Sequence, residues 1–301
     1  MKSRTKKKAS PLRAKMNVFD VLLYLFMGLF VLSVIYPFWD LMVKSFSSPS
    51  AATKLTFSFF PEKWSLASYR AVFLGGNIDI AYINTIFRTV VGTVLGLIVN
   101  VCGAYALSKK TLPFRNAITM FLVFTMFFSG GMIPSYMNIK NLGLMDNIWV
   151  LILPMIANVY NLVILRNYIQ GIDKGLEESA QIDGANQFTI LFRIILPVCK
   201  PVLATVALWT MVAHWNSWFD ALMYTNSIDL TVLQYELRKI LVQTENSEML
   251  RFQAVSGDAS AFTPESIKAA FMYISILPIL FAYPFLQKYF VKGIMMGSLK
   301  G

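Results

Sequence analysis

The sequence predicts an all-α, polytopic membrane protein with six transmembrane helices and with its N- and C-termini in the cytoplasm. Of the 301 residues 56% are apolar and only 14% are charged, and the mean hydropathy is +0.57. Six long uncharged runs separate the few charged residues. If each run crosses the membrane, the basic residues gather on one side of it. A soluble domain carries roughly a quarter of its residues as Asp, Glu, Lys and Arg, so an ordinary soluble enzyme is disfavoured.

The uncharged runs predict the spans. They are 19 to 24 residues long, and a helix needs roughly 20 residues to cross about 30 Å of hydrocarbon. Because lipid offers no partners to the backbone, each run must be helical despite its β-branched residues. The predicted spans cover about residues 19–43, 83–108, 116–137, 147–166, 198–222 and 267–287. Gly130-Gly131 and the prolines Pro134, Pro154 and Pro278 interrupt helical hydrogen bonding and permit kinks.

Residues 1–18 form a basic tail with Lys and Arg and no acidic residue. The positive-inside rule places this tail in the cytoplasm, and six crossings return the C-terminus there. The first apolar run is longer than the roughly 7–15 residues of a signal peptide, so we interpret it as a span. Membrane topology explains the net charge of +11 without a nucleic-acid partner. Residues 19–301 are predicted to form a single transmembrane domain.

Three connections are long. The outer loop 44–82 contains residues 61–73, which have the pattern of a short amphipathic helix at the membrane interface. The other two are the cytoplasmic loop 166–197 and the outer loop 224–266, in which residues 233–242 are predicted to be a short helix. Long loops in compact proteins are often functional. We therefore expect one loop to meet a partner outside and one to meet a partner inside.

The cytoplasmic loop carries the most specific pattern. A short helix is predicted to end near Gly184, which can adopt the left-handed C-cap conformation. A second helix should begin with Asn186 as its N-cap and end at Pro197. Two short helices at an angle, with small residues near the bend, form a compact knob that can dock in a groove of a soluble partner.

At these residues the chain resembles the permease subunits of bacterial ABC importers. Their signature is Glu-Ala-Ala, three residues, Gly, nine residues, and then Ile-x-Leu-Pro. The matching positions are Glu178, Ala180, Gly184, Ile194, Leu196 and Pro197, while Ser179 replaces the second Ala. The resemblance implies the type I permease fold, with a coupling helix that sits in a cleft of the ATP-hydrolysing subunit. The residues that it assigns to ATPase coupling are Glu178, Ser179, Ala180, Asp183, Gly184 and Ala185.

The resemblance covers nearly the whole chain and narrows to carbohydrate importers of the maltose-transporter type. The segments that carry it are Asn84-Thr85, Ala104–Ser108, Gly143–Trp149, His214-Trp215-Asn216 and the ending Leu286–Gly301. The ending and the lysine-rich tail look most like permeases for pectin- or alginate-derived oligosaccharides. The resemblance implies a subunit that moves an oligosaccharide across the bacterial cytoplasmic membrane by alternating access.

The chain lacks the residues for chemistry of its own. It has no Gly-x-x-x-x-Gly-Lys-Ser/Thr loop for ATP phosphates. His214 is its one histidine, and neither Cys102 nor Cys199 has a neighbouring ligand. We expect no catalytic residue, no metal and no cofactor on this chain. The resemblance implies two ATP-binding subunits that use ATP and Mg, a second homologous permease subunit, and an extracytoplasmic solute-binding protein.

Polar and aromatic residues at membrane depth are candidates for the substrate path, because such residues usually face the bundle interior or an aqueous cavity. These candidates are Asn158, Asn161, Trp215, Asn216 and Trp218. Indole rings can stack on the apolar faces of sugars, and amides can bond their hydroxyls. Interhelical hydrogen bonding by the asparagines and interfacial anchoring by the tryptophans are the more common roles of such residues, and they stay open as alternatives. For Arg88, one turn inside the outer interface, we expect a side chain that reaches back to that interface.

A stripe of mostly small residues follows one face of the second span. It contains Gly92, Gly96, Asn100 and Gly103, and it favours close approach of a neighbouring helix. Three alternatives to a sugar importer stay open at this point. They are a permease for another solute, a channel or scaffold that needs no ATPase, and a membrane enzyme. An ATPase and a binding protein that copurify with the chain would favour the importer.

Overall fold

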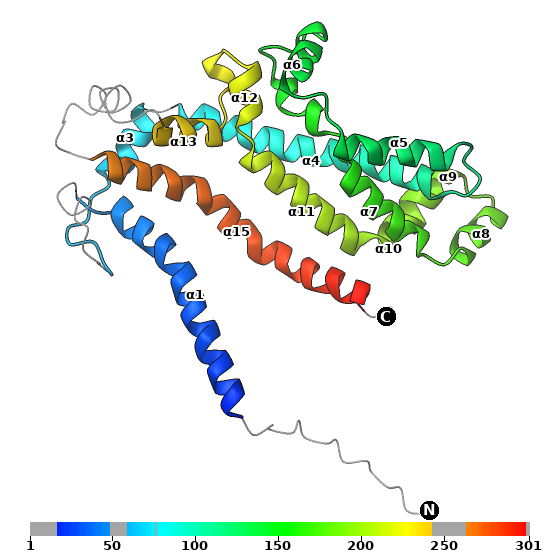
Figure 1. The fold of residues 1–301 in the computed structure, drawn as a ribbon, viewed down its shortest axis with the longest axis horizontal. Coiled ribbons are helices and arrows are strands. Elements are labelled where there is room, and N and C mark those ends of the chain that lie inside the picture. The colour runs from blue at the N-terminus through cyan, green and yellow to red at the C-terminus, as the bar shows by residue number, and fades with distance from the viewer. Residues whose placement is uncertain (1–16, 49–58, 76, 243–262, 299–301) are drawn as a thin grey trace, which may run out of the picture.

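The computed structural model describes residues 17–48, 59–75, 77–242 and 263–298 (Figure 1). Within these ranges the chain forms helices and no strand. The β contact within the described ranges is an isolated bridge between Ser47 and Trp64. The prediction of an all-α fold is confirmed.

Three helices are each long and apolar enough to cross a membrane. They are α1 (Val18–Ser45), α4 (Ile78–Ser108) and the Pro264–Phe281 part of α15 (Pro264–Ser298). Helix α1 packs against α15, while most of its side chains remain exposed. An apolar helix with an exposed surface is suited to lipid or to another membrane subunit.

The other apolar segments are bent pairs of helices. Their members are α5 (Arg115–Phe127) with α6 (Met132–Asn141), then η1 (Ile148–Leu151) and η2 (Leu153–Met155) with α7 (Val159–Gln170), and finally residues 187–198 with α11 (Lys200–Asn216). The bends are 116°, 47° and 85°. Gly131 lies at the sharpest break with φ +87°, a conformation that glycine adopts without strain. If each pair is one span, the described residues contain six candidate spans.

Helix α4 is the centre of the bundle. It packs along both α7 and α11, and Figure 1 shows these three helices running beside one another. The small-residue stripe permits this approach, because a Cβ added to Gly103 would lie 2.9 Å from Cδ1 of Leu162 on α7. The prediction that the stripe serves close packing is confirmed.

Short elements gather at the two ends of α4 (Figure 1). Helices α3 (Ala67–Gly75) and α13 (Leu233–Val242) lie near its beginning, together with α12 (Phe219–Tyr224) and η4 (Ile228–Leu230) nearby. Near its end lie α8 (Gly175–Ile182), α9 (Gln187–Thr189), the π-helix η3 (Ile190–Ile195) and α10 (Leu196–Val198). The predicted helix at 233–242 is confirmed. The outer-loop helix begins at Ala67 rather than near residue 61.

Candidate functional site

The knob formed by residues 175–198 lies at the end of α4 that is remote from α3 and α13 (Figure 1). Gly184 has φ +81° and follows α8 directly after Asp183, so it adopts the left-handed conformation that its position predicts. The amide of Ala185 donates to the carbonyl of Ala180 at 2.9 Å and closes the turn. Ala180 is buried, whereas Glu178, Ser179, Asp183 and Gly184 are exposed. The exposed residues are therefore free to meet a partner.

The second half of the knob begins as predicted and continues further than predicted. The side chain of Asn186 accepts a hydrogen bond from the Thr189 amide at 2.8 Å and caps α9. Pro197 was expected to end this helix, and the helix continues for one more residue, to Val198. Pro197 itself lies in the helical backbone that runs from η3 into α10. The chain then breaks at Cys199, where it bends into α11.

The surface of the knob is unusually apolar. Ile182 is 86% exposed, Phe188 73% and Phe192 54%. Glu178 in the same knob is also exposed. Exposed apolar patches rimmed by polar groups mark protein interaction sites. The arrangement suits insertion of the knob into a cleft of another subunit.

Polar contacts connect the knob to the end of α4. Lys109 pairs with Glu177 of α8, and its Nζ lies 4.1 Å from the ring centroid of Tyr105. The Tyr105 hydroxyl is 2.7 Å from Oε1 of Gln187 in α9. These residues line an open cavity of about 990 Å³ between α8 and the loop after α4. The knob is thus joined to the end of α4 by direct contacts. These contacts could not be predicted from the sequence, because opposite charges in separate loops do not reveal their pairing.

The structure brings Asn158 and Asn161 together at the start of α7. Oδ1 of Asn158 accepts from the Asn161 amide at 3.0 Å and caps the helix. Nδ2 of Asn161 donates to Oγ1 of Thr210 on α11 at 3.3 Å, and Oδ1 of Asn100 on α4 accepts from the Asn158 amide at 3.2 Å. Both asparagines also line a pocket of about 210 Å³ between α7 and α11. They therefore join three helices and border a cavity at once.

Trp215, Asn216 and Trp218 lie elsewhere. The buried Trp215 donates from Nε1 to the carbonyl of Ser275 at 3.3 Å and belongs to the core with α15. Asn216 donates to the carbonyl of Val212 in its own helix at 3.0 Å. The guanidinium of Arg238 lies 3.8 Å from the ring centroid of Trp218. None of the three predicted residues lines the pocket beside Asn158.

Most of the residues that line this pocket were not among the predicted candidates. The full lining consists of Met155, Asn158, Tyr160, Asn161, Trp209, Thr210, Ala213 and His214. On α11, Ala213 follows Trp209 by four residues and His214 follows Thr210 by four, so these side chains share one helix face. This spacing was the signal available in the sequence. It places Trp209 on the pocket face of α11 and Trp215 on a different face.

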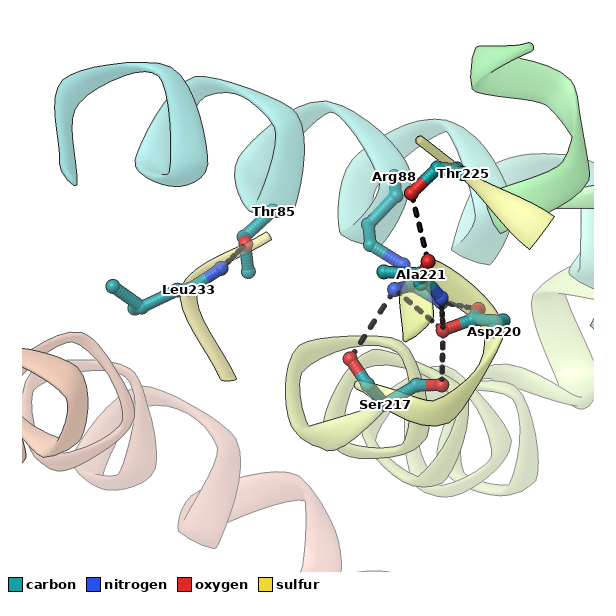
Figure 2. A network of polar contacts seen from close by, with 7 residues as sticks. All are labelled: Thr85, Arg88, Ser217, Asp220, Ala221, Thr225 and Leu233. Carbon is teal, nitrogen blue, oxygen red and sulfur yellow. Dashed lines mark hydrogen bonds and ion pairs between the residues drawn. The ribbon is translucent and has the colours of Figure 1, made fainter. Parts of the chain in front are cut away.

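The outer half of α4 holds a buried ion pair, shown in Figure 2. Arg88 is fully buried, and both of its terminal nitrogens contact the carboxylate of Asp220 in α12. Nη1 of Arg88 also donates to the carbonyl of Ser217 at 3.2 Å, and Oδ1 of Asp220 accepts from the Ala221 amide at 3.0 Å. The expectation that Arg88 reaches the interface is wrong, because α12 supplies a carboxylate at the same depth.

Two residues beside Arg88 attach the outer segment to α4. Oγ1 of Thr85 accepts from the Leu233 amide at the start of α13 at 2.9 Å (Figure 2). Nδ2 of Asn84 donates to the carbonyls of Asp229 and Thr231 at 2.7 and 2.9 Å. Together with the ion pair, these bonds fix α12, η4 and α13 to the outer half of α4.

Comparisons with known proteins agree with this architecture. A family model described as "Binding-protein-dependent transport system inner membrane component" matches residues 10–296. The chain is 41% identical over 288 residues to Protein LplC of Bacillus subtilis, covering 95% of this chain and 96% of that protein. It is 38% identical over 287 residues to the polygalacturonan/rhamnogalacturonan transport system permease protein YtcP of the same organism, covering 95% and 100%.

A solved structure shows the same fold. It is described as the crystal structure of a bacterial ABC transporter involved in the import of the acidic polysaccharide alginate. A chain of that structure matches with a TM-score of 0.85 at 33% identity, covering 93% of this chain and 100% of that chain.

Proposed function

The chain belongs to the family of binding-protein-dependent transport system inner membrane components, and we propose that it is the permease subunit of an ATP-driven oligosaccharide importer. The observation that carries this proposal is the exposed apolar knob around Gly184, which is joined to α4 through Lys109 and Tyr105. If the chain were a channel or scaffold that needs no ATPase, the exposed apolar surface of the knob would have no role.

The knob connects the spans to a separate ATP-hydrolysing subunit. Two such subunits bind ATP and Mg in the cytoplasm, and their closure displaces the knob. The spans of this chain and of a second, homologous permease then rock between inward-open and outward-open states. ATP drives this cycle only if its binding free energy differs between the two states. The described parts of the outer loop 224–266, residues 224–242 and 263–266, are our candidates for contact with the solute-binding protein, and residues 243–262 lie outside the described residues. This chain itself carries no hydrolytic chemistry.

The solute is an oligosaccharide derived from a plant or algal polysaccharide. Relatives named for polygalacturonan, rhamnogalacturonan and alginate support this class of solute. The pocket between α7 and α11 offers aromatic rings together with neutral amide and hydroxyl groups. Those groups match the apolar ring faces and the hydroxyls of a sugar.

Reconstitution tests the proposal. The chain would be purified with its ATPase, its permease partner and its binding protein, and incorporated into liposomes with ATP on the side of the knob. Uptake of two labelled probes is then measured, a galacturonate trisaccharide and a galactose trisaccharide, which differ only at C6. We expect uptake of at least one probe, dependent on hydrolysable ATP and on the binding protein. Uptake without ATP would identify a channel, and transport of neither probe would overturn the assigned solute class.

A further inference from the structure

Resting on the proposed function, we infer that the pocket between α7 and α11 is a subsite for one sugar unit, with His214 as its central hydrogen-bonding residue and Gly92 as the residue that positions the imidazole. The subsite recognises the ring face and the secondary hydroxyls of the sugar rather than a carboxylate. Four observations lead to this assignment.

The first observation is the state of His214. Its side chain is completely buried and borders the pocket. Within the described part of the chain, neither Nδ1 nor Nε2 has a hydrogen-bond partner. A buried polar group without a partner is costly, and such groups are rare in native structures. Because the Nε2 edge of the ring faces Gly92 of α4, a solute hydroxyl in the pocket would supply a partner to Nδ1, either as donor or as acceptor.

The second observation is the chemistry of the remaining lining. The rings of Tyr160 and Trp209 lie 5.9 Å apart between centroids, and the two residues are 54% and 36% exposed. Asn158, Asn161 and Thr210 add neutral donors and acceptors. An apolar platform beside neutral polar groups matches a sugar, which has a C–H face and a rim of hydroxyls.

The third observation concerns size and charge. A pocket of about 210 Å³ has the volume of about seven waters at ≈ 30 Å³ each, which suits one monosaccharide unit. Its lining contains no Lys, Arg, Asp or Glu. Arg88 acts electrostatically on His214, but its charge is already paired with Asp220. A sugar carboxylate therefore finds no free cation here.

The fourth observation explains why a glycine faces the imidazole. A Cβ added to Gly92 would lie 2.4 Å from Nε2 of His214 and 2.6 Å from Cε1, so alanine must displace the ring. Gly96, one turn further along α4, is different. Its Cβ would meet only the Ile156 carbonyl at 3.4 Å and Thr210 Cγ2 at 3.6 Å, which are ordinary contacts. Gly92 is thus a positioning residue, and Gly96 provides the matched control.

The test uses the complete reconstituted transporter and whichever of the two trisaccharides the wild type transports faster. His214→Ala, Trp209→Leu and Gly92→Ala should each raise the apparent KM for uptake by about tenfold, the effect of losing one good solute contact. The ATPase rate with saturating binding protein should stay within about twofold of wild type, since the coupling machinery is intact. Gly96→Ala should retain the wild-type KM, whereas His214→Gln, which keeps a donor and an acceptor, should recover part of the loss seen in His214→Ala.

A double variant separates positioning from general packing. In the His214→Ala background there is no ring to displace, so Gly92→Ala should cause no further rise in KM. Independent, multiplicative effects would overturn the inference. It would also be overturned if the single variants left KM unchanged, or if uptake and ATPase fell in parallel. These outcomes are read in a transporter whose wild type imports the probe, so they are distinct from failure of the proposed function.

Discussion

At the scale of single residues, Arg88 and Asp220 show how charge is accommodated inside the bundle. The guanidinium meets the carboxylate through two nitrogens, and the Ser217 hydroxyl and the Ala221 amide donate to the same carboxylate. This two-pronged geometry requires arginine, because a lysine ammonium is a single point charge. The pair holds α12 against α4 and thereby fixes the outer segment.

Breaking this pair should destabilise the protein strongly. Asp220→Ala leaves the buried Arg88 charge uncompensated, and we expect a loss of about 3–5 kcal/mol in the free energy of unfolding. Denaturant titration in detergent measures the change. The control is Lys44→Ala, which removes the partly exposed Lys44–Asp40 pair (2.8 Å) and should cost at most about 1 kcal/mol. Equal losses for the two variants would contradict the role assigned to the buried pair.

Asp146 fixes the loop after α6 to the loop after α12. Its Oδ1 accepts from the amides of Asn226 and Ser227 at 2.9 Å each, and its own amide donates to the Tyr224 carbonyl at 2.8 Å. The hydrogen bonds from Ser227 and Asn226 lower the pKa of Asp146 below its usual 3.8. The contact between the loops therefore depends on the ionised carboxylate.

The pH dependence of this contact follows from the sign of the shift. A carboxyl group whose pKa is lowered in the folded protein contributes fully above its unfolded pKa of 3.8, and the contribution is lost as the pH falls through the folded value. Hydrogen exchange should thus show constant Asp146-dependent protection of the Asn226 and Ser227 amides at neutral and mildly acidic pH, with loss only below pH 3.8. Asp146→Ala should lack this protection throughout. Loss of protection between pH 7 and about pH 5 would count against this account.

At the scale of elements, the helix caps could be predicted from local sequence signals, whereas the bends between helices could not. The C-cap at Gly184 and the N-cap at Asn186 depend on the chemistry of a few neighbouring residues, and both were predicted. Gly130-Gly131 indicated a possible kink, but the 116° bend between α5 and α6 depends on packing against other helices. Composition cannot reveal that angle. The break at Cys199, two residues after Pro197, has the same origin.

The contact between Lys109 and Glu177 belongs to this scale because it joins two elements. Lys109→Glu should place two carboxylates side by side and loosen α8 from α4. We expect uptake per ATP hydrolysed to fall by about fivefold, equivalent to about 1 kcal/mol of coupling. The exchanged pair, Lys109→Glu with Glu177→Lys, should recover most of this loss. Full coupling in the single variant would show that the contact transmits nothing.

At the scale of the whole molecule, the apolar excess and the basic charge have separate causes. Six apolar segments account for the first, and an uneven distribution of Lys and Arg between the two sides accounts for the second. The fold class could be predicted because the length of the apolar runs and the spacing of the charges are visible along the sequence itself. It was harder to predict which of Trp209 and Trp215 borders the pocket, because the two lie on different faces of α11. Only the packing of α7 and α15 shows which face borders the pocket.

The central claim is that the knob transmits the ATPase cycle to the spans, and Gly184 tests it most directly. Nothing in the described part of this chain lies within 4 Å of an added Cβ at this position, so within the chain a substitution acts through the backbone at φ +81°. Valine is strained there, whereas asparagine tolerates this conformation.

The measurement is ATP-driven uptake of the trisaccharide in liposomes by the wild type, Gly184→Val and Gly184→Asn, with membrane insertion quantified for each. The account predicts that Gly184→Val inserts normally and loses at least about tenfold in uptake, consistent with the roughly 1–3 kcal/mol cost of a strained backbone. Gly184→Asn should retain most of the activity. Normal uptake by Gly184→Val would contradict the account.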